Sequence, residues 1–379
     1  MLETIGSTPR AAVRTVSLAC RAALSDLRQC AWLSACSGGA DSLAMTILAA
    51  ELALRWQVPF RAVVVDHQLR AESATEANAA LAELSRWGIG ALITRAETDV
   101  GSRQPRSDSA TGRISEPFTD GLEAFARQRR YRLLTDAAND FQQETGRPVA
   151  VLLGHTMDDQ AETVLLGLAH GAGGRSLAGM QTRRPRVKAG NQLTDVTWVR
   201  PLLGVRRADT LAAIEQLGAR RVEDPTNTLE GPWRRADGGP LPRLAVRHQV
   251  LPALAKALGK DPVPALARTA THLQDDNEYL QQQAAELLRT AHQGQGAYRV
   301  EILRQAPAAL RGRALVQLCR YHCGGRVHHR QVGDVERLIT NYHGQGPVDL
   351  PGGVQCMRQR DDDGQAVVIV VGRAQTVGN

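Results

Sequence analysis

The sequence predicts an α/β fold, with a parallel doubly wound sheet followed by a helical module and a small α+β C-terminal domain. Two patterns carry this prediction. In the N-terminal part, short apolar runs alternate with stretches of helical periodicity, which is typical of a parallel sheet with helices on both faces. Beyond Pro242, helical periodicity continues with no strand-like run between the helices. The length of 379 residues favours more than one domain.

Four strand and helix pairs make up the predicted sheet. Residues 61–65 read RAVVV, and such a continuous apolar run is expected of a strand that is covered on both faces. The predicted strands are residues 31–36, 60–65, 91–95 and 149–153, and the helices that follow them are residues 43–55, 72–87, 122–141 and 160–168. Polar stretches containing glycine and proline are predicted loops or boundaries at residues 101–121, 183–195 and 228–242.

The C-terminal third has a different pattern. Its predicted helices are residues 246–258, 264–289, 308–321 and 332–341, and its predicted strands are residues 347–350 and 366–371. The change of pattern divides the chain into three predicted domains, residues 1–228, 229–299 and 300–379.

The composition is that of a globular protein with a basic balance. Hydrophobic residues make up 43% and charged residues 22%, which excludes a disordered chain. The 46 Lys and Arg against 39 Asp and Glu give a net charge of +7, which weakly favours a polyanionic partner. Because the apolar runs are short and arginines interrupt the N-terminal one, we expect a cytoplasmic protein that does not span a membrane.

The most informative segment is SGGADS at residues 37–42, between the first predicted strand and its helix. Glycines let the backbone approach a ligand closely, and the N–H groups at a helix start favour an anion. The segment is neither a Walker A loop nor a G-x-G-x-x-G fingerprint. The alternative is a plain strand-to-helix turn that Asp41 or Ser42 caps. The predicted phosphate-binding residues are Ser37, Gly38, Gly39, Ala40, Asp41 and Ser42.

Further segments extend this pattern in a fixed order. They are VDHQLR at 65–70, ARQRRY at 126–131, GHTMDDQAET at 154–163, SLAGM at 176–180, RPLL at 200–203 and DPTN at 224–227. Together with SGGADS, this series resembles the tRNA(Ile)-lysidine synthetases, a family of PP-loop (N-type) ATP pyrophosphatases. The resemblance covers about residues 33–254, and more weakly LPGGV at 350–354.

The resemblance implies a ligase that consumes ATP. Such an enzyme ligates lysine to C2 of the wobble cytidine in the isoleucine tRNA with a CAU anticodon. The cytosine O2 is first adenylated with release of pyrophosphate, and lysine then attacks C2 and displaces AMP to give lysidine. The implied small molecules are ATP, Mg²⁺ and L-lysine. Residues 1–228 would be the catalytic domain and residues 229–299 the tRNA-binding module. The oligomeric state is left open, with a homodimer as one option.

Several site residues follow from the motifs and from their strand-end positions. Asp41, Asp158 and Asp159 are predicted near Mg²⁺, which prefers carboxylate oxygens; the alternative for Asp158 and Asp159 is to cap the following helix. The predicted catalytic residues are Asp41, Arg127, Arg130, His155 and Asp159, and His67 joins the predicted nucleotide contacts. Asp66, Glu72 and Glu162 are all eligible to hold the lysine ammonium.

A basic segment near the third boundary is predicted to contact tRNA, because phosphates attract arginine. The residues are Arg234, Arg235, Arg243, Arg247 and His248. The chain departs from the family here, since Leu244 and Ala245 stand where Asn and Arg are usual, and the insertion at 231–242 precedes them.

Two other functions are alternatives for such a sequence. A tRNA-thiolating PP-loop enzyme needs reactive cysteines, and the catalytic part has only Cys20, Cys30 and Cys36. A non-catalytic ATP- or RNA-binding protein would not need the intact loop and acidic pair. Cys319 and Cys323 lack a second ligand pair, so no zinc site is predicted there.

Overall fold

The computed structural model describes residues 9–66, 68, 73–95, 121–170, 173–184, 188–189, 192–193, 196–231, 234–235, 237–324 and 327–372. His67, Glu72 and most of the predicted loop at 101–121 lie outside these residues. The chain divides into two compact units, Met1–Thr271 and His272–Asn379. Within the described residues, no helix combines the length and the apolar character needed to cross a membrane.

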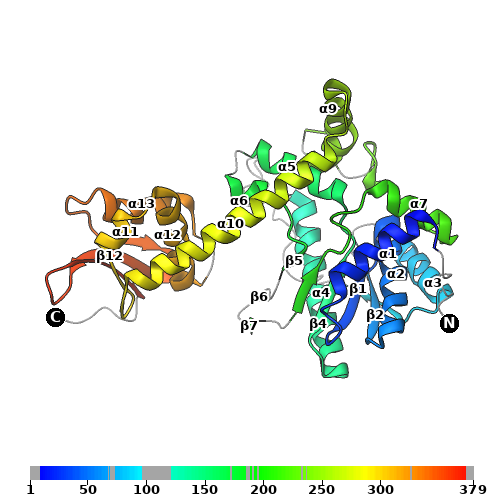
Figure 1. The fold of residues 1–379 in the computed structure, drawn as a ribbon, viewed down its shortest axis with the longest axis horizontal. Coiled ribbons are helices and arrows are strands. Elements are labelled where there is room, and N and C mark those ends of the chain that lie inside the picture. The colour runs from blue at the N-terminus through cyan, green and yellow to red at the C-terminus, as the bar shows by residue number, and fades with distance from the viewer. Residues whose placement is uncertain are drawn as a thin grey trace, which may run out of the picture. The chain divides into compact units, whose positions relative to one another are not determined.

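A six-stranded sheet forms the centre of the first unit (Figure 1). Its strands are β1 (Ala31–Ala35), β2 (Phe60–Asp66), β3 (Ala91–Arg95), β4 (Val149–Leu153), β5 (Arg183–Arg184) and β8 (Val196–Val199). They lie in the order β3-β2-β1-β4-β8-β5, and every pair is parallel except β5 with β8. This arrangement confirms the predicted doubly wound parallel sheet.

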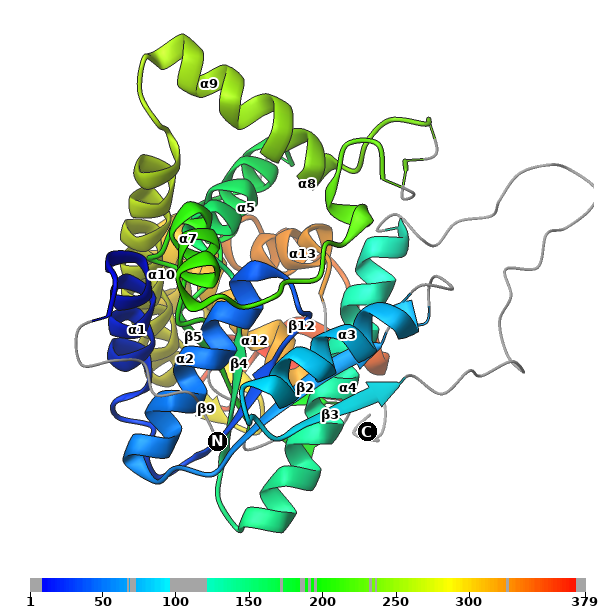
Figure 2. The same cartoon turned by 90° about the vertical axis from the view of Figure 1, so that its right-hand side faces the viewer.

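Helices cover both faces of this sheet (Figure 2). They are α1 (Ala11–Leu24), α2 (Ala40–Trp56), α3 (Ser73–Arg86), α4 (Gly121–Thr145) and α7 (Arg207–Leu217). Successive strand residues alternate between faces, so Trp32 joins the core under α1, α2, α3 and α7, whereas Leu33 joins the core under α4. All five residues of β1 are therefore buried, as expected for a strand covered on both sides.

The elements of this unit that were not predicted include α1, β8 and α7, and the predicted loop at 183–195 contains the two-residue strands β5, β6 and β7. β8 has only four residues, which is too short for a clear alternation. Helix α7 begins with charged residues, and its sequence RADTLAAIEQL has no clear apolar stripe. Burial of Ala213 and Ile214 against α1 and α2 stabilises it instead.

A helical segment completes the first unit. It contains α5 (Met157–Ala169), α6 (Gly174–Leu177), α8 (Pro242–Ala245), a π-helical turn (Val246–Val250) and α9 (Leu251–Leu258). The predicted helix at 246–258 is thus continuous with α8 through the π-turn. A 3-10 turn, Pro225–Asn227, precedes this segment, and a small hairpin pairs β6 (Lys188–Ala189) with β7 (Gln192–Leu193). Helix α10 (Val263–Ala291) begins in the first unit and ends in the second.

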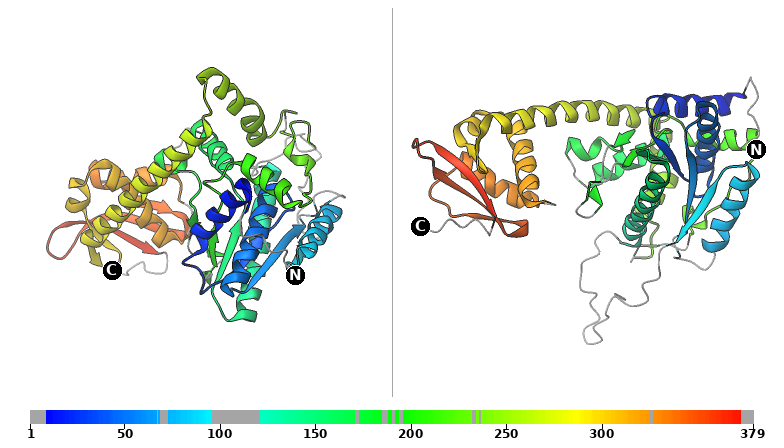
Figure 3. Two further views of the ribbon diagram at one scale, coloured as in Figure 1. Left: turned by 45° about the vertical axis from the view of Figure 1, so that its right-hand side comes forward. Right: turned by 90° about the horizontal axis from the view of Figure 1, so that it is seen from below.

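The second unit is an α+β fold with a core of its own. Its antiparallel sheet has the order β11-β12-β13-β10-β9. The strands are β9 (His292–Gly294), β10 (Ala297–Arg299), β11 (Val348–Leu350), β12 (Val354–Arg360) and β13 (Ala366–Gly372), and a 3-10 turn, Pro351–Gly353, joins β11 to β12. Helices α11 (Val300–Gln305), α12 (Ala308–Cys323) and α13 (His329–Thr340) pack against this sheet (Figure 3).

Candidate active site

The predicted phosphate loop and the predicted residues His155, Asp158 and Asp159 lie at the carboxyl ends of β1 and β4. In the sheet, β2 lies beside β1 on one edge and β4 lies beside β1 on the other edge, so the strand order reverses direction between β1 and β4. The carboxyl edge between two such strands is where open α/β sheets bind ligands. The SGGADS loop follows β1, and the GHTMDD segment follows β4. The topology therefore brings two motifs together that are far apart in the sequence.

Gly154 allows these two segments to approach closely. A Cβ atom on Gly154 would lie 2.8 Å from the Ser42 Cα and 2.9 Å from the Ser42 N. Both are backbone atoms at the start of α2, so neither can move away cheaply. Any other residue at this position would push the end of β4 off the phosphate loop.

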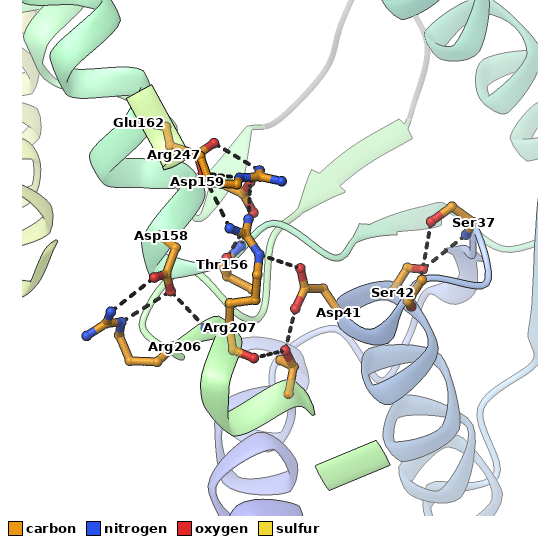
Figure 4. Close-up of polar contacts among 12 residues, drawn as sticks. Ser37, Asp41, Ser42, Thr156, Asp158, Asp159, Glu162, Arg206, Arg207 and Arg247 are labelled. Atoms are coloured by element: carbon orange, nitrogen blue, oxygen red, sulfur yellow. Dashed lines mark hydrogen bonds and ion pairs between the residues drawn. The ribbon is translucent and has the colours of Figure 1, made fainter. Parts of the chain in front are cut away.

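Internal hydrogen bonds fix the loop itself. The Ser42 hydroxyl donates to the Gly39 carbonyl at 3.1 Å. It also accepts from the Ser37 N–H at 3.1 Å (Figure 4). Gly38 has φ +81°, and a Cβ there would lie 2.8 Å from Val222 Cγ2. This position requires glycine, because a side chain would meet both backbone strain and a steric clash.

Gly39 is a glycine for a different reason. The nearest atom to a Cβ built there is Ser37 Oγ at 3.6 Å, an ordinary contact, so packing does not require glycine. Helix α2 begins directly after Gly39, which has no side chain to cap the first turn. Neither Asp41 nor Ser42 is the N-cap. The surface in front of the helix start suits a ligand that approaches the backbone, such as a phosphate group.

Arg207 lies at the centre of the acidic groups (Figure 4). Its Nε donates to Asp41 Oδ2 at 3.2 Å, and its Nη2 donates to Asp159 Oδ1 at 2.8 Å. The third nitrogen, Nη1, lies 3.4 Å from Glu162 Oε1. Arg207 was not among the predicted site residues. The available signal was the pair Arg206 and Arg207, which follows the RPLL motif closely.

Asp159 combines the two roles that the sequence left open. Its Oδ2 accepts from the Thr156 N–H at 2.8 Å and from the Thr156 hydroxyl at 2.9 Å, which forms a capping box at the start of α5. Its Oδ1 faces Arg207. Burial alone would raise the pKa of Asp159, but Arg207 and Arg243 hold it well below its ordinary value. The carboxyl group is therefore ionised at neutral pH.

Asp158 points away from this pair. Both of its oxygens contact the Arg206 guanidinium, at 3.0 and 3.2 Å, and Oδ2 also accepts from the Arg207 N–H at 2.8 Å (Figure 4). Arg206 in turn pairs with Asp261. Of the three carboxylates predicted near Mg²⁺, Asp41 and Asp159 converge, whereas Asp158 anchors the start of α7.

Glu162 is fully buried and forms ion pairs with two further arginines, Arg243 and Arg247. Arg247 Nε donates to Oε1 at 2.7 Å, and Arg243 Nε donates to Oε2 at 2.8 Å. Both arginine side chains are only 20% exposed. Arg243 and Arg247, which were predicted to contact tRNA, thus pair with Glu162 and Asp159 inside the protein. Glu162 is surrounded by cations, so it is poorly placed to hold an ammonium group without rearrangement.

The other predicted tRNA contacts lie at the surface. Arg234 and Arg235 are exposed in the loop before α8, where Arg235 pairs with Asp237. His248 is exposed on the π-helical turn. These three side chains are accessible to a large polyanion.

A cationic and aromatic group lies beside the acidic pair. Arg127 sits over the Tyr131 ring, 5.4 Å from its centroid, and Arg200 Nη2 donates to the Tyr131 hydroxyl at 3.4 Å. Burial lowers the pKa of Arg130, although acidic neighbours oppose it. Neither the Arg127 nor the Arg130 guanidinium makes a hydrogen bond or ion pair to the described residues, although that of Arg127 contacts the Tyr131 ring. Both guanidiniums are therefore available to a ligand.

His155 is held in its neutral form. Burial lowers its pKa well below 6.5, Asp159 opposes this shift, and Arg130, Arg200 and Arg243 reinforce it. Its buried Nδ1 has no hydrogen-bond partner among the described residues. A neutral imidazole beside Arg130 can accept a hydrogen bond from a bound substrate.

The carboxylates fit a magnesium ion only in part. Asp41 and Asp159 supply hard carboxylate oxygens. One oxygen of each, Asp41 Oδ2 and Asp159 Oδ1, accepts a hydrogen bond from Arg207. No three His, Cys, Asp or Glu side chains within the described ranges converge closely enough to hold a metal ion. Two carboxylates with the remaining positions filled by phosphate and water are the usual protein contribution to Mg²⁺. The donor set therefore suits Mg²⁺ bound together with a nucleotide.

A cavity of about 220 Å³ opens next to the ion pairs. Its polar wall carries Asp158, Glu162, Arg206, Arg207, Arg247 and Asp261, and its apolar wall carries Leu251, Pro252, Ala255, Pro262 and Val263.

Asp66, another candidate for an ammonium contact, is 2% exposed and accepts from Ser73 Oγ at 2.8 Å and from the Gln68 N–H at 3.0 Å.

Comparison with known proteins identifies relatives over most of the chain. A model of the PP-loop domain family matches residues 14–254. The chain is 40% identical over 332 residues to a tRNA(Ile)-lysidine synthase of Salinispora arenicola, covering 86% of this chain and 88% of that protein. It is 37% identical over 365 residues to a tRNA(Ile)-lysidine synthase of Thermobifida fusca, covering 96% of this chain and 99% of that protein.

Proposed function

This chain belongs to the tRNA(Ile)-lysidine synthase family of PP-loop proteins, and from that membership we propose how its residues carry out the reaction. It is an ATP-using, ligase-type enzyme that modifies tRNA. The observation that supports our assignment of the site is the approach of Gly154 to Ser42, which brings the phosphate loop and the acidic segment together at one sheet edge.

The reaction exchanges a carbonyl oxygen for an amine. The cytosine O2 attacks the α-phosphorus of ATP, the bond to the bridging oxygen breaks, and pyrophosphate leaves. The lysine amine then attacks C2, the C2–O bond breaks, AMP leaves with the former carbonyl oxygen, and the nitrogen loses a proton. Negative charge grows on the phosphate oxygens in the first step, so nearby cations stabilise its transition state.

The described residues provide for these steps. The start of α2 and the backbone at Gly39 would bind the phosphates, while Arg127 and Arg130 would neutralise the developing charge. Neutral His155 would accept a hydrogen bond from the attacking amine and so orient it. A magnesium ion held by Asp41 and Asp159 would supply additional positive charge at the phosphates.

The 220 Å³ cavity is our proposed binding site for the lysine nucleophile. Lysine carries two ammonium groups, one carboxylate and a four-carbon chain. Asp158, Asp261 and the arginines match its charges, and Leu251, Ala255 and Val263 match its chain. In this location Glu162 would line the lysine site. Asp66 would not contact lysine, because it accepts hydrogen bonds from Gln68 and Ser73 in its own loop.

Contacts to tRNA are assigned to the exposed residues Arg234, Arg235 and His248. Phosphate contacts of this kind make affinity fall steeply with salt, so a filter-binding salt series on the double variant Arg234→Ala, Arg235→Ala checks the assignment. A shallower salt dependence than that of the unaltered protein is expected. With these substrates, a cytoplasmic location is part of the proposal.

Sulfur transfer is disfavoured by the burial of the thiols. Cys20, Cys30 and Cys36 are 0%, 5% and 2% exposed. Burial raises the pKa of Cys20 to about 12 and also raises the pKa of Cys36. Thiols that are buried and protonated are poor carriers of persulfide sulfur.

The deciding experiment measures AMP release and lysine incorporation together. The purified protein is incubated with ATP, Mg²⁺, radiolabelled lysine and an isoleucine tRNA transcript bearing CAU, with a transcript of altered anticodon as the control. Both products are expected from the CAU transcript. Both are expected to vanish in Asp41→Ala but persist in Asp136→Ala, which removes an exposed carboxylate on α4.

Pyrophosphate release without lysine incorporation would retain the adenylation step but replace the nucleophile. If ATP were not consumed at all, the proposed reaction would be wrong.

A further inference from the structure

Arg207 contacts carboxylates from two different helices, and it lies outside the motifs that identified the site. Asp41 comes from α2, whereas Asp159 comes from α5. The guanidinium donates to both, at 3.2 and 2.8 Å. A divalent cation bound by the same two carboxylates would need the same oxygen atoms.

The second oxygen of each carboxylate is already used. Asp159 Oδ2 accepts two hydrogen bonds from Thr156, and Asp41 Oδ1 accepts from the Thr210 hydroxyl. The remaining oxygens, Asp159 Oδ1 and Asp41 Oδ2, both accept from Arg207. Asp159 Oδ1 also lies 3.4 Å from Arg243 Nη2 and 3.3 Å from Arg247 Nη2, whereas neither of these arginines contacts Asp41 among the described contacts. Of the guanidiniums that the structure describes here, Arg207 is the one that bonds to both carboxylates, so a cation that bridges them competes with it directly.

We propose that Arg207 competes with a divalent cation for Asp41 and Asp159, so that the cation binds tightly only together with a triphosphate. Phosphate oxygens accept the planar guanidinium in the same fork geometry as carboxylates do. A nucleotide can thus draw Arg207 off the carboxylates while it supplies further ligands to the cation. Arg207 acts here as a positioning residue that couples the two binding events. This inference rests on the proposed use of Mg²⁺ with ATP.

The test measures binding of Mn²⁺ without nucleotide, by titration followed through the electron paramagnetic resonance of the free ion. Arg207→Gln is expected to bind Mn²⁺ at least about tenfold more tightly than the unaltered protein, because a positive charge within a few ångströms of the ion is removed. Arg206→Gln is the matched control. This variant also loses one guanidinium, but Arg206 contacts Asp158 and Asp261 instead of the two proposed cation ligands. The Arg206→Gln protein is therefore expected to bind Mn²⁺ with the same affinity as the unaltered protein.

A non-hydrolysable ATP analogue provides the second arm. It should increase the Mn²⁺ affinity of the unaltered protein more than that of Arg207→Gln. If the glutamine variant does not fold, Arg207→Lys replaces it, because lysine keeps the charge but cannot reach several carboxylates at once. A smaller but measurable gain in Mn²⁺ affinity is expected for it.

Equal Mn²⁺ affinity in the Arg207 variant and the unaltered protein, or an equal gain in Arg206→Gln, would overturn the inference. These titrations need no turnover, so their failure is distinguishable from failure of the ligase assay with the unaltered protein.

Discussion

At the scale of single residues, the charges of the site depend on partners that are distant in sequence. The SGGADS loop and the acidic pair were predictable because their residue types have local meaning beside a strand end. The pairing of Glu162 with Arg243 and Arg247, 81 and 85 residues away, was not predictable. Tertiary packing decides it, and it directs into the protein two arginines that were predicted to contact tRNA.

His155 is expected to make the stability of the protein depend on pH below about 6.5. The unfolded histidine has its ordinary pKa of 6.5, whereas burial keeps the folded one well below that value. As the pH falls below 6.5, the unfolded chain gains a proton that the folded chain does not. The unfolding free energy should therefore fall by up to about 1.4 kcal/mol per pH unit from this group.

The measurement is urea unfolding at pH 7.5 and 5.5, for the unaltered protein and for His155→Gln. The variant should lack this part of the decrease. An identical decrease in both proteins would show that His155 is not held neutral. The contribution of Asp159 is lost only at lower pH, because its ordinary pKa of 3.8 is also depressed on folding.

At the scale of elements, the four strands β1 to β4 were predicted close to their observed bounds, since each is a short apolar run with a clear turn on either side. Helix α7 was missed, and with it Arg207. Its sequence lacks an apolar stripe, and its place is set by contacts with α1 and α2 that no local pattern reveals.

The approach of β4 to α2 can be tested by substitution. Gly154→Ala places a methyl group 2.8 Å from the Ser42 Cα, so it is expected to destabilise the protein by about 1–3 kcal/mol and to weaken ATP binding. Gly90→Ala is the control, because nothing lies within 4 Å of a Cβ there. Urea unfolding and ATP titration measure both effects. Equal behaviour of the two variants would contradict the steric argument.

At the scale of the whole molecule, each compact unit has a core of its own. The described tryptophans, Trp32, Trp56, Trp87 and Trp198, all lie in the first unit, and the sequence has no tryptophan after position 233. Tryptophan fluorescence therefore reports unfolding of the first unit, whereas far-ultraviolet circular dichroism reports both.

Core substitutions should separate the two units. Leu318→Ala removes a side chain that is 1% exposed in the second core, and Leu48→Ala removes one that is 0% exposed in the first. Each should destabilise its own unit by about 2–5 kcal/mol. Only Leu48→Ala should shift the fluorescence transition, while both shift the circular dichroism. A fluorescence shift in Leu318→Ala would show that the units unfold together.

The pairing of β1 with β4 also governs the order in which the site appears during folding. Residues 36–148 intervene between these neighbouring strands, so their contact closes a long loop. The N-terminal part leaves the ribosome first. A growing chain thus contains its phosphate loop well before Asp159 is synthesised, and it gains the complete nucleotide site only when β4 has joined the sheet beside β1.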